Sequence, residues 1–351
     1  MYRVTSIFLT LTVISGTLIV ISSENWFIIW VGLEISTLAL VPLLSSNFLP
    51  RNIEATIKYF LVQALSAAIL LNGALIQAWL VGTWSILEPL NNISSILLII
   101  AIAFKLGLAP CHFWYPDVLQ GLPFLQGLII ATWQKIAPLI ILFSFNQLII
   151  DPLVILLGIL SVLVGGWGGL NQTQIRKILA FSSIGNMGWI TTTSAYSCNA
   201  ALSMLIIYLI INTAIFLVLD FFKAPTLGHL NILAQLSPIS ILLIITSVLS
   251  LGGLPPLTGF MLKFFSLYFL INNGFIILSS LLIIGSLLSL FFYLRISFNV
   301  SLILFPQHII SLTSWRNMSY LTPTNKTWLV STFSILGTFT IPLTLYLYII
   351  I

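Results

Sequence analysis

The sequence predicts an all-α polytopic membrane protein, and three observations carry this prediction. Of 351 residues, 59% are hydrophobic and only 5% are charged, whereas soluble domains carry about 25% charged residues. The apolar runs are continuous and roughly 20 residues long, which is the length that a helix needs to cross about 30 Å of hydrocarbon. The alternating pattern of a transmembrane β-barrel is absent from these runs. Soluble domains and membrane barrels are therefore excluded.

About eleven transmembrane helices are expected, separated by short segments rich in polar residues, Gly or Pro. The first begins directly after Arg3, so it is interpreted as a membrane span and not as a cleavable signal. The segment 301–325 mixes apolar and polar residues and is expected to lie at the membrane interface. The expected spans are 4–22, 26–44, 55–81, 93–120, 123–146, 152–170, 175–193, 200–222, 237–271, 274–299 and 326–350.

Positive charges lie on one side of this predicted topology. Nine of the twelve Lys and Arg residues fall in alternate loops, starting at the N-terminus, whereas the opposite loops hold only Glu24, Glu88 and Asp151. Loops on the cytosolic or matrix side carry an excess of Lys and Arg. We therefore expect the N-terminus on that side and the C-terminus on the other. The nine cations are Arg3, Arg51, Lys58, Arg176, Lys177, Lys223, Arg295, Arg316 and Lys326.

An internal repeat relates the fourth and ninth spans. Leu-Gly-x-x-Pro occurs at 106–110 and 251–255, each time eight residues after Leu-Ile-Ile. Proline interrupts a helix, so both spans should be broken. Repeats of five spans, 1–146 and 147–300, then have opposite topology, followed by a C-terminal helix in 326–351. Inverted repeats with matching broken helices are typical of transporters. Chance matches between leucine-rich segments are the alternative, against which the shared Gly and Pro argue.

Four ionisable side chains are expected inside spans: Glu34, Lys105, Lys135 and Lys263. A charge at the bilayer centre costs about 2.5–3.5 kcal/mol on insertion scales, so such residues usually mark ion or proton pathways. Desolvation disfavours their charged forms, whereas a Glu34–Lys105 pair would hold both charged. These residues indicate a proton relay, and His112, directly after the first break, is a further candidate. The alternative is a static pair or snorkelling to the interface, which suits Lys263 best.

Other chemistry is not indicated by the sequence. No motif for a nucleotide, haem, iron–sulfur cluster or metal is present, so the chain itself is not expected to perform redox reactions. Cys111 and Cys198 stand in different segments and predict neither a disulfide nor a metal site. Gly165 and Gly169 fit close helix packing in membranes.

Four segments carry a resemblance to a known family. They read K-L-G-L-A-P-C-H-F-W at 105–114, T-W-Q-K-I-A-P at 132–138, G-G-L-N-Q-T at 168–173 and S-L-G-G-L-P-P-L-T-G-F at 250–260. In this order they closely resemble NADH–ubiquinone oxidoreductase subunit 2, an antiporter-like membrane subunit of respiratory complex I. The resemblance covers nearly the whole chain, and eleven spans match the animal mitochondrial form.

The resemblance implies a proton-translocating core subunit, coupled to electron transfer from NADH to ubiquinone. It implies the mitochondrial inner membrane, with the N-terminus in the matrix and the C-terminus in the intermembrane space. NADH, FMN, iron–sulfur clusters and ubiquinone would belong to other subunits of this H⁺-translocating NADH:ubiquinone reductase. The partners would be those subunits, especially the neighbouring antiporter-like ones, and membrane lipids, with no nucleic acid.

Individual roles follow from the resemblance position by position. Glu34 matches the glutamate that pairs with the lysine at Lys105, Lys135 matches the connecting lysine, and Lys263 matches the lysine of the second half-channel. His112 falls at the histidine of the H-F-W motif. These five residues are the predicted proton relay.

Two positions depart from the family pattern. Cys111 stands where phenylalanine is usual, and Asn186 stands where many members have histidine. An amide cannot titrate, so water or neighbouring hydroxyls would have to replace any protonic role at Asn186.

Two other functions remain open from the residues alone. One is a cation/proton antiporter subunit outside the respiratory chain, and the other is a structural membrane subunit with inert buried charges. Co-purification with flavin and iron–sulfur subunits would separate the first from the predicted function. Activity after neutralising the lysines would separate the second.

Overall fold

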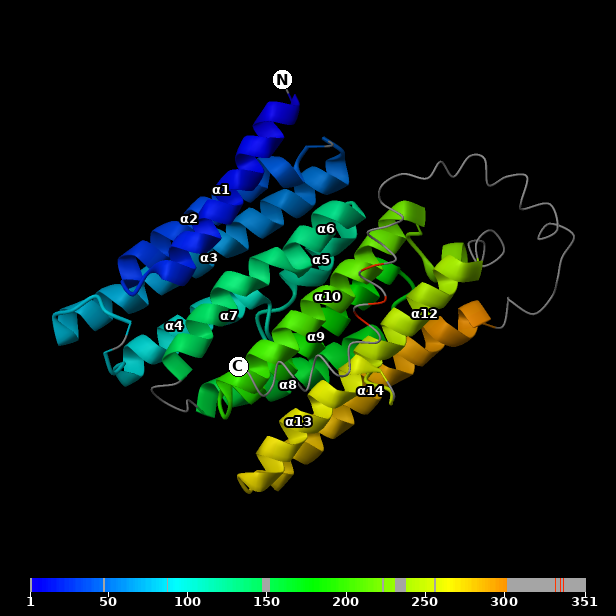
Figure 1. Ribbon diagram of the computed structural model, residues 1–351. Coiled ribbons are helices and arrows are strands. Elements are labelled where there is room, and N and C mark those ends of the chain that lie inside the picture. Colours follow the sequence, from blue (N-terminus) through cyan, green and yellow to red (C-terminus); the bar gives the residue numbers. More distant parts are fainter. Residues whose placement is uncertain are drawn as a thin grey trace, which may run out of the picture.

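The computed structural model confirms the all-α class within the part of the chain that it describes (Figure 1). The extended pairings there are two isolated bridges, between Asn25 and Ser85 and between Gln174 and Thr226. The expected segment 301–325 and the expected last span lie outside the described residues, apart from residue 301 and three single positions. The described residues are 2–46, 48–86, 88–146, 152–222, 224–230, 238–255 and 257–301, with Thr332, Ile335 and Gly337.

Seven of the described helical stretches are long and apolar enough to cross a membrane by length and composition. The N-terminal helices are α1 (Tyr2–Ser22), α2 (Trp26–Leu44), α3 (Pro50–Val81), α4 (Asn92–Leu106), α5 (Trp114–Gly121), α6 (Phe124–Ala131) and α7 (Trp133–Asn146). The later ones are α8 (Pro152–Gly169), α9 (Ile175–Ser194), α10 (Cys198–Phe222), α12 (Pro238–Gly252), α13 (Thr258–Asn272) and α14 (Ile276–Ser301).

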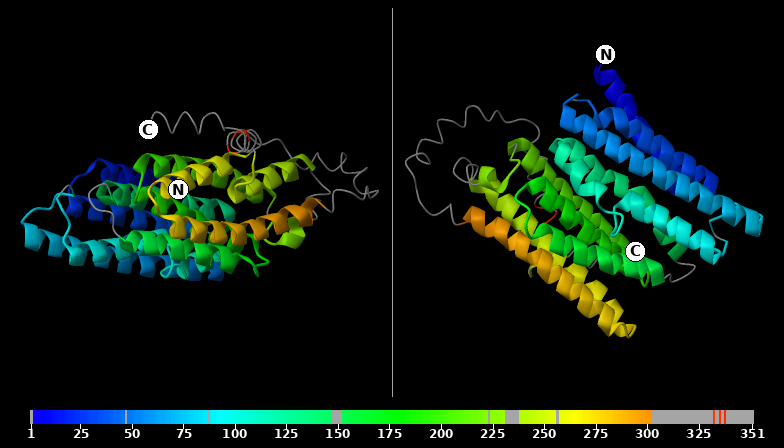
Figure 2. Two further views of the ribbon diagram at one scale, coloured as in Figure 1. Left: turned by 90° about the horizontal axis from the view of Figure 1, so that it is seen from below. Right: turned by 180° about the vertical axis from the view of Figure 1, so that it is seen from behind.

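Helix α10 lies at the centre of the bundle and connects its two sides. In Figure 1, α1–α3 form one flank, α12–α14 form the other, and α8–α10 run between them. Helix α10 packs against α6 from the first part of the chain and against α9, α12 and α13 from the second. Figure 2 shows the same helices running roughly side by side when the molecule is turned. Residues on α10 can therefore contact both parts of the chain.

Glycines allow α8 to approach α9 and α14 closely. A Cβ at Gly165 would lie 2.6 Å from the backbone nitrogen of Gly185 on α9, and a Cβ at Gly169 would lie 2.7 Å from the Phe292 ring on α14. Small residues bring helix backbones together in membranes, where van der Waals packing drives association. The predicted packing role of Gly165 and Gly169 agrees with these contacts.

Within the described residues three spans are interrupted, whereas the sequence predicts two. Residues 107–113 separate α4 from α5, and residues 253–257 separate α12 from α13, as predicted. Each of these breaks begins at a glycine with positive φ, Gly107 at 73° and Gly253 at 78°, a conformation that glycine adopts without steric cost. The third interruption lies at Thr132, between α6 and α7, inside the span expected over 123–146. Neither glycine nor proline occupies this position, so the sequence gives no signal for it.

Charged helix ends meet at one end of the bundle. Lys58 Nζ lies 2.7 Å from Glu54 Oε1 and 3.5 Å from Asp117 Oδ2, which links α3 to α5. Arg176, at the start of α9, donates a hydrogen bond to the carbonyl of Leu122, which follows α5. A cation near a helix C-terminus interacts favourably with the last carbonyls.

Arg295 makes the corresponding contacts on the other flank. From α14 it donates to the carbonyl oxygen of Leu170 at 2.6 Å and to that of Gln172. Both acceptors follow the C-terminus of α8. These contacts agree with the gathering of cations that the sequence predicts, and the membrane side that this end faces stays a prediction.

Candidate functional site

Lys105 occupies the last turn of α4, directly before the first break. Its side chain is only 5% exposed, and Nζ has no hydrogen-bond acceptor among the residues that the structure describes. The neighbouring carbonyl of Phe104 is occupied, because the Trp114 indole donates to it at 3.1 Å. The C-terminal end of a helix carries partial negative charge, so this position favours a cation.

Glu34, on α2, is the carboxylate that acts on Lys105. The two side chains interact electrostatically, although no direct ion pair joins them in the described structure. Thr37 Oγ1 donates to Glu34 Oε2 at 3.1 Å. Glu34 also acts on the buried Tyr59, whose hydroxyl donates to Gln134 Oε1 at 3.4 Å. The structure therefore holds Glu34 within electrostatic range of Lys105 without an ion pair, and the hydrogen bond of Tyr59 reaches Gln134, the neighbour of Lys135.

Lys135, on α7, is enclosed by aromatic rings. Its side chain is 2% exposed, and Nζ lies 4.4 Å from the ring centroid of Tyr115 and 5.7 Å from that of Tyr208. Within the described residues Nζ has no hydrogen-bond acceptor. A cation over an aromatic ring gains about 0.5–2 kcal/mol, more when desolvated. Tyr115 belongs to α5 and Tyr208 to α10, so Lys135 lies where the two parts of the chain meet.

The side chain of Lys263, on α13, extends across the second break to the end of α12. Its Nζ donates to the carbonyl oxygen of Gly252 at 2.9 Å, which caps the last residue of α12. Its stem lies over Gly253, where a Cβ would be only 3.0 Å from Cδ. Lys105 thus stands in the last turn of α4, before its break, whereas Lys263 follows its break and brings its ammonium to the C-terminal end of α12, where a positive charge is favoured.

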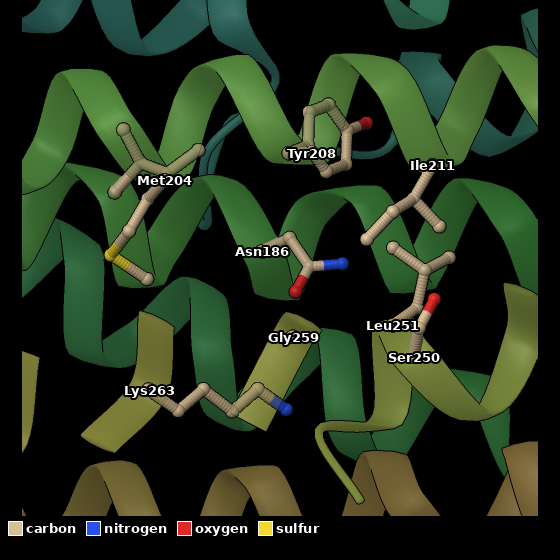
Figure 3. Close-up of a pocket in the computed structure, with 9 residues that line it drawn as sticks. Asn186, Met204, Tyr208, Ile211, Ser250, Leu251, Gly259 and Lys263 are labelled. Atoms are coloured by element: carbon tan, nitrogen blue, oxygen red, sulfur yellow. The ribbon is translucent and has the colours of Figure 1, made fainter. Parts of the chain in front are cut away.

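A small cavity lies beside Lys263 (Figure 3). Its volume is about 30 Å³, and its polar lining comes from Asn186, Tyr208, Ser250 and Lys263. Figure 3 shows Asn186 and the extended Lys263 side chain on facing sides of it. A polar cavity of more than about 10–15 Å³ can hold a water molecule. The cavity therefore has room for one water molecule beside Asn186, Ser250 and Lys263.

His112 lies in a different environment from the lysines. Its side chain is 7% exposed, its Nδ1 lies 3.3 Å from the carbonyl oxygen of Pro110, and its ring lies 4.3 Å from that of Phe113. It borders a hollow of about 340 Å³ that is also lined by Asp117 and Lys177. The contacts described for His112 therefore point to the charged end of the bundle and not to Lys105 or Lys135.

Hydroxyl groups between the lysines are not predicted from the sequence. Ser183, on α9, lies near the hydroxyls of Tyr115 and Tyr208, and the hydroxyl of Tyr293 lies near Asn186. The sequence gives only a general indication of these groups, since any tyrosine in an apolar helix has a hydroxyl that needs a partner. Which tyrosines face the lysines depends on helix packing, which a single sequence does not show.

Family models and known proteins match most of the chain. A family model described as NADH:quinone oxidoreductase/Mrp antiporter matches residues 23–289, and a second, NADH dehydrogenase subunit 2 C-terminus, matches residues 290–348. NADH-ubiquinone oxidoreductase chain 2 of Paracentrotus lividus is 69% identical over 350 residues, which is 99% of each chain. The protein of that name from Xenopus laevis is 45% identical over 329 residues, which is 94% of each chain.

Solved structures show the same architecture. A chain of respiratory complex I from Thermus thermophilus with bound aureothin is 27% identical, with a TM-score of 0.78 over 96% of this chain and 79% of that one. A chain of the Mrp complex from Dietzia sp. DQ12-45-1b is 21% identical, with a TM-score of 0.75 over 82% of this chain and 59% of that one, a likeness of fold alone. The chain therefore belongs to the family of NADH–ubiquinone oxidoreductase subunit 2, an antiporter-like membrane subunit of respiratory complex I.

Proposed function

We propose that this multi-pass subunit carries protons across the mitochondrial inner membrane through Glu34, Lys105, Lys135 and Lys263. The observation that carries the proposal is the place of the three lysines. Each stands at a helix interruption: Lys105 before the first break, Lys135 just after Thr132, and Lys263 across the second break. Broken helices in membrane transporters mark the substrate and ion pathway, and ionisable residues inside spans mark proton relays.

The interruptions suit a lysine that gains and loses a proton. Irregular backbone inside a membrane is tolerated only where protein or a water-filled cavity supplies partners for its polar groups. Such groups are the partners that an ammonium needs. In each transfer the lysine nitrogen releases a proton to the next acceptor, becomes a neutral amine, and takes a new proton from the preceding donor. The carboxylate of Glu34 stabilises the ammonium form of Lys105, so a change in their separation controls release.

In this proposal, polar groups lie between these carriers. The Tyr59 hydroxyl donates to Gln134 Oε1, next to Lys135, and the charge of Glu34 acts on Tyr59. From Lys135 the proposed path continues past Tyr208 to the cavity that Lys263 lines. In this proposal His112 exchanges protons with the solvent at the charged end, through the hollow that it borders.

The remaining assignments follow from the family. We assign NADH, FMN, the iron–sulfur clusters and ubiquinone to other subunits, which supply the driving force by electron transfer. The N-terminus would face the matrix and the C-terminus the intermembrane space, in line with the gathering of cations at one end. Exposed apolar side chains on α1 and α14, such as Phe8 and Phe291, would contact lipids and neighbouring antiporter-like subunits.

The test is proton flux per NADH oxidised in vesicles that contain the assembled complex. Lys135→Met keeps an apolar stem but removes the carrier, so flux should fall while complex content is retained. Lys58→Met is the matched control, because Lys58 is a partly exposed cation at the charged end whose ion pairs contribute little. Normal flux with Lys135→Met would leave only a static role for this lysine. Failure to co-purify with flavin and iron–sulfur subunits would instead indicate an antiporter outside the respiratory chain.

A further inference from the structure

The interruption at Thr132 changes the hydrogen bonding of the Ala131 carbonyl inside the bundle. In a continuous α-helix the N–H of Lys135 would donate to the carbonyl of Ala131, four residues earlier. Here the N–H of Lys135 donates to the carbonyl of Thr132 at 3.2 Å. The hydroxyl of Tyr208, on α10, donates to the carbonyl of Ala131 at 3.2 Å in its place. Because an unpaired buried carbonyl is costly, this hydrogen bond stabilises the interruption.

Tyr208 is itself held by a second hydrogen bond. Asn212, one turn further along α10, donates from Nδ2 to Tyr208 Oη at 2.9 Å. Tyr208 is 4% exposed and Asn212 is 1% exposed, so water does not compete freely for either group. A hydroxyl that accepts from one fixed partner and donates to another has a defined direction. The orientation of the Tyr208 ring is thereby set.

Tyr208 stands between two of the proposed carriers. Its ring centroid lies 5.7 Å from Lys135 Nζ, and the residue lines the cavity that contains Lys263. In Figure 3 the Tyr208 hydroxyl points away from Lys263. The residue thus borders the Lys263 cavity while its hydroxyl reaches α6. Because Lys135 follows the interruption by three residues, the direction of its side chain depends on how α7 leaves α6.

We propose that Tyr208, anchored by Asn212, is a positioning residue that maintains the α6–α7 interruption and so places Lys135 where the two parts of the chain meet. The inference rests on the proposed role of Lys135 as a proton carrier. Tyr208 acts through its bond to Ala131, not by carrying the proton. Tyr115 differs in this respect, since its ring is closer to Lys135 but its hydroxyl lies near Ser183, whereas the hydroxyl of Tyr208 is the one that donates to Ala131.

This difference provides a matched pair of variants. Tyr208→Phe and Tyr115→Phe both keep the aromatic ring beside Lys135, but only the first removes a hydrogen bond to the interruption. In vesicles with the assembled complex, Tyr208→Phe should lower proton flux per NADH oxidised by about three- to tenfold, the value of one buried hydrogen bond. Tyr115→Phe should stay within about twofold of the parent. Flux per NADH in an assembled complex reports coupling, which a purely structural role would leave unchanged.

Several outcomes would overturn the inference. Unchanged flux with Tyr208→Phe removes the positioning role, and an equal loss in both variants assigns the effect to proton conduction by hydroxyls. If Tyr208→Phe does not assemble, Asn212→Leu removes the anchor alone and should give a smaller loss in the same direction; no loss there also overturns the inference. The Lys135→Met variant distinguishes failure of the relay from failure of the positioning role. Normal flux with Lys135→Met refutes the relay, whereas lost flux there with normal flux in Tyr208→Phe refutes only the positioning role.

Discussion

Replacing Lys105 with methionine tests the proposed relay, because its effect on stability can be measured separately from its effect on proton transport. The change keeps an unbranched stem and removes the ammonium, which is buried without a hydrogen-bond acceptor among the described residues. Removing this charge relieves about 2.5–3.5 kcal/mol on insertion scales. It also forfeits the attraction of Glu34, which is the smaller contribution, because burial acts on Lys105 more strongly than Glu34 does.

The expected result is a complex that assembles normally but does not pump. Stability should be unchanged or slightly higher, because the burial cost that is removed outweighs the attraction of Glu34 that is lost. Proton transport and coupled quinone reduction should fall together, because the carrier is absent. Glu34→Gln should be milder, since it removes the attraction and leaves the carrier in place.

The assay is proton flux per NADH oxidised in reconstituted vesicles, with complex content and thermal unfolding measured on the same samples. Normal flux with Lys105→Met in a fully assembled complex would refute the relay role of this lysine. A loss of stability of about 3 kcal/mol would refute this balance and would show that the attraction between Lys105 and Glu34 stabilises the fold.

Two further predictions concern packing and orientation. Gly188→Ala should destabilise α8–α9 packing by about 1–3 kcal/mol, because its Cβ would lie 2.6 Å from a carbonyl oxygen of α8. Gly185→Ala, where a Cβ meets nothing within 4 Å, should be neutral or stabilising in thermal unfolding of the same complex. A membrane-impermeant thiol reagent on the matrix side should label Glu54→Cys, at the charged end, and not Thr83→Cys after the opposite end of α3; the reverse pattern would invert the proposed topology.

Helix positions are predictable here because the membrane imposes a simple rule on the sequence. An apolar run of spanning length must form a helix, since no other open structure satisfies its backbone in lipid. The expected span 26–44 coincides with α2, and 152–170 differs from α8 by one residue. The helix containing the expected span 55–81 begins earlier, at Pro50, because proline suits the first helical turn and the polar residues there remain at the charged end.

Breaks are predictable only where the local residue causes them. Pro110 and Pro255 lack a backbone donor, and each follows a glycine, Gly107 or Gly253, by two or three residues. Both interruptions are therefore visible in the sequence. The interruption at Thr132 has no such residue. It is supported from outside the helix by Tyr208, a residue 76 positions later in the chain. Support from a distant helix leaves no local pattern.

The same distinction between local and distant causes applies to the candidate site. Lysines inside apolar helices stand out because their insertion is costly, so the three proposed carriers can be named from the sequence. Their partners cannot, because the rings around Lys135 come from α5 and α10 and the carbonyl beneath Lys263 comes from α12. The place of His112, near the charged end, likewise depends on how α5 packs.

Asn186 shows how the relay can continue without a titrating group at that position. Its side chain lines the cavity together with Ser250, Tyr208 and Lys263. An amide donates and accepts hydrogen bonds at once but does not take up a proton, so it can orient a water molecule without competing for the proton. The cavity volume of about 30 Å³ is enough for one water molecule. Under the proposed relay, the proton passes between Lys135 and Lys263 through a water molecule that Asn186 and Ser250 orient.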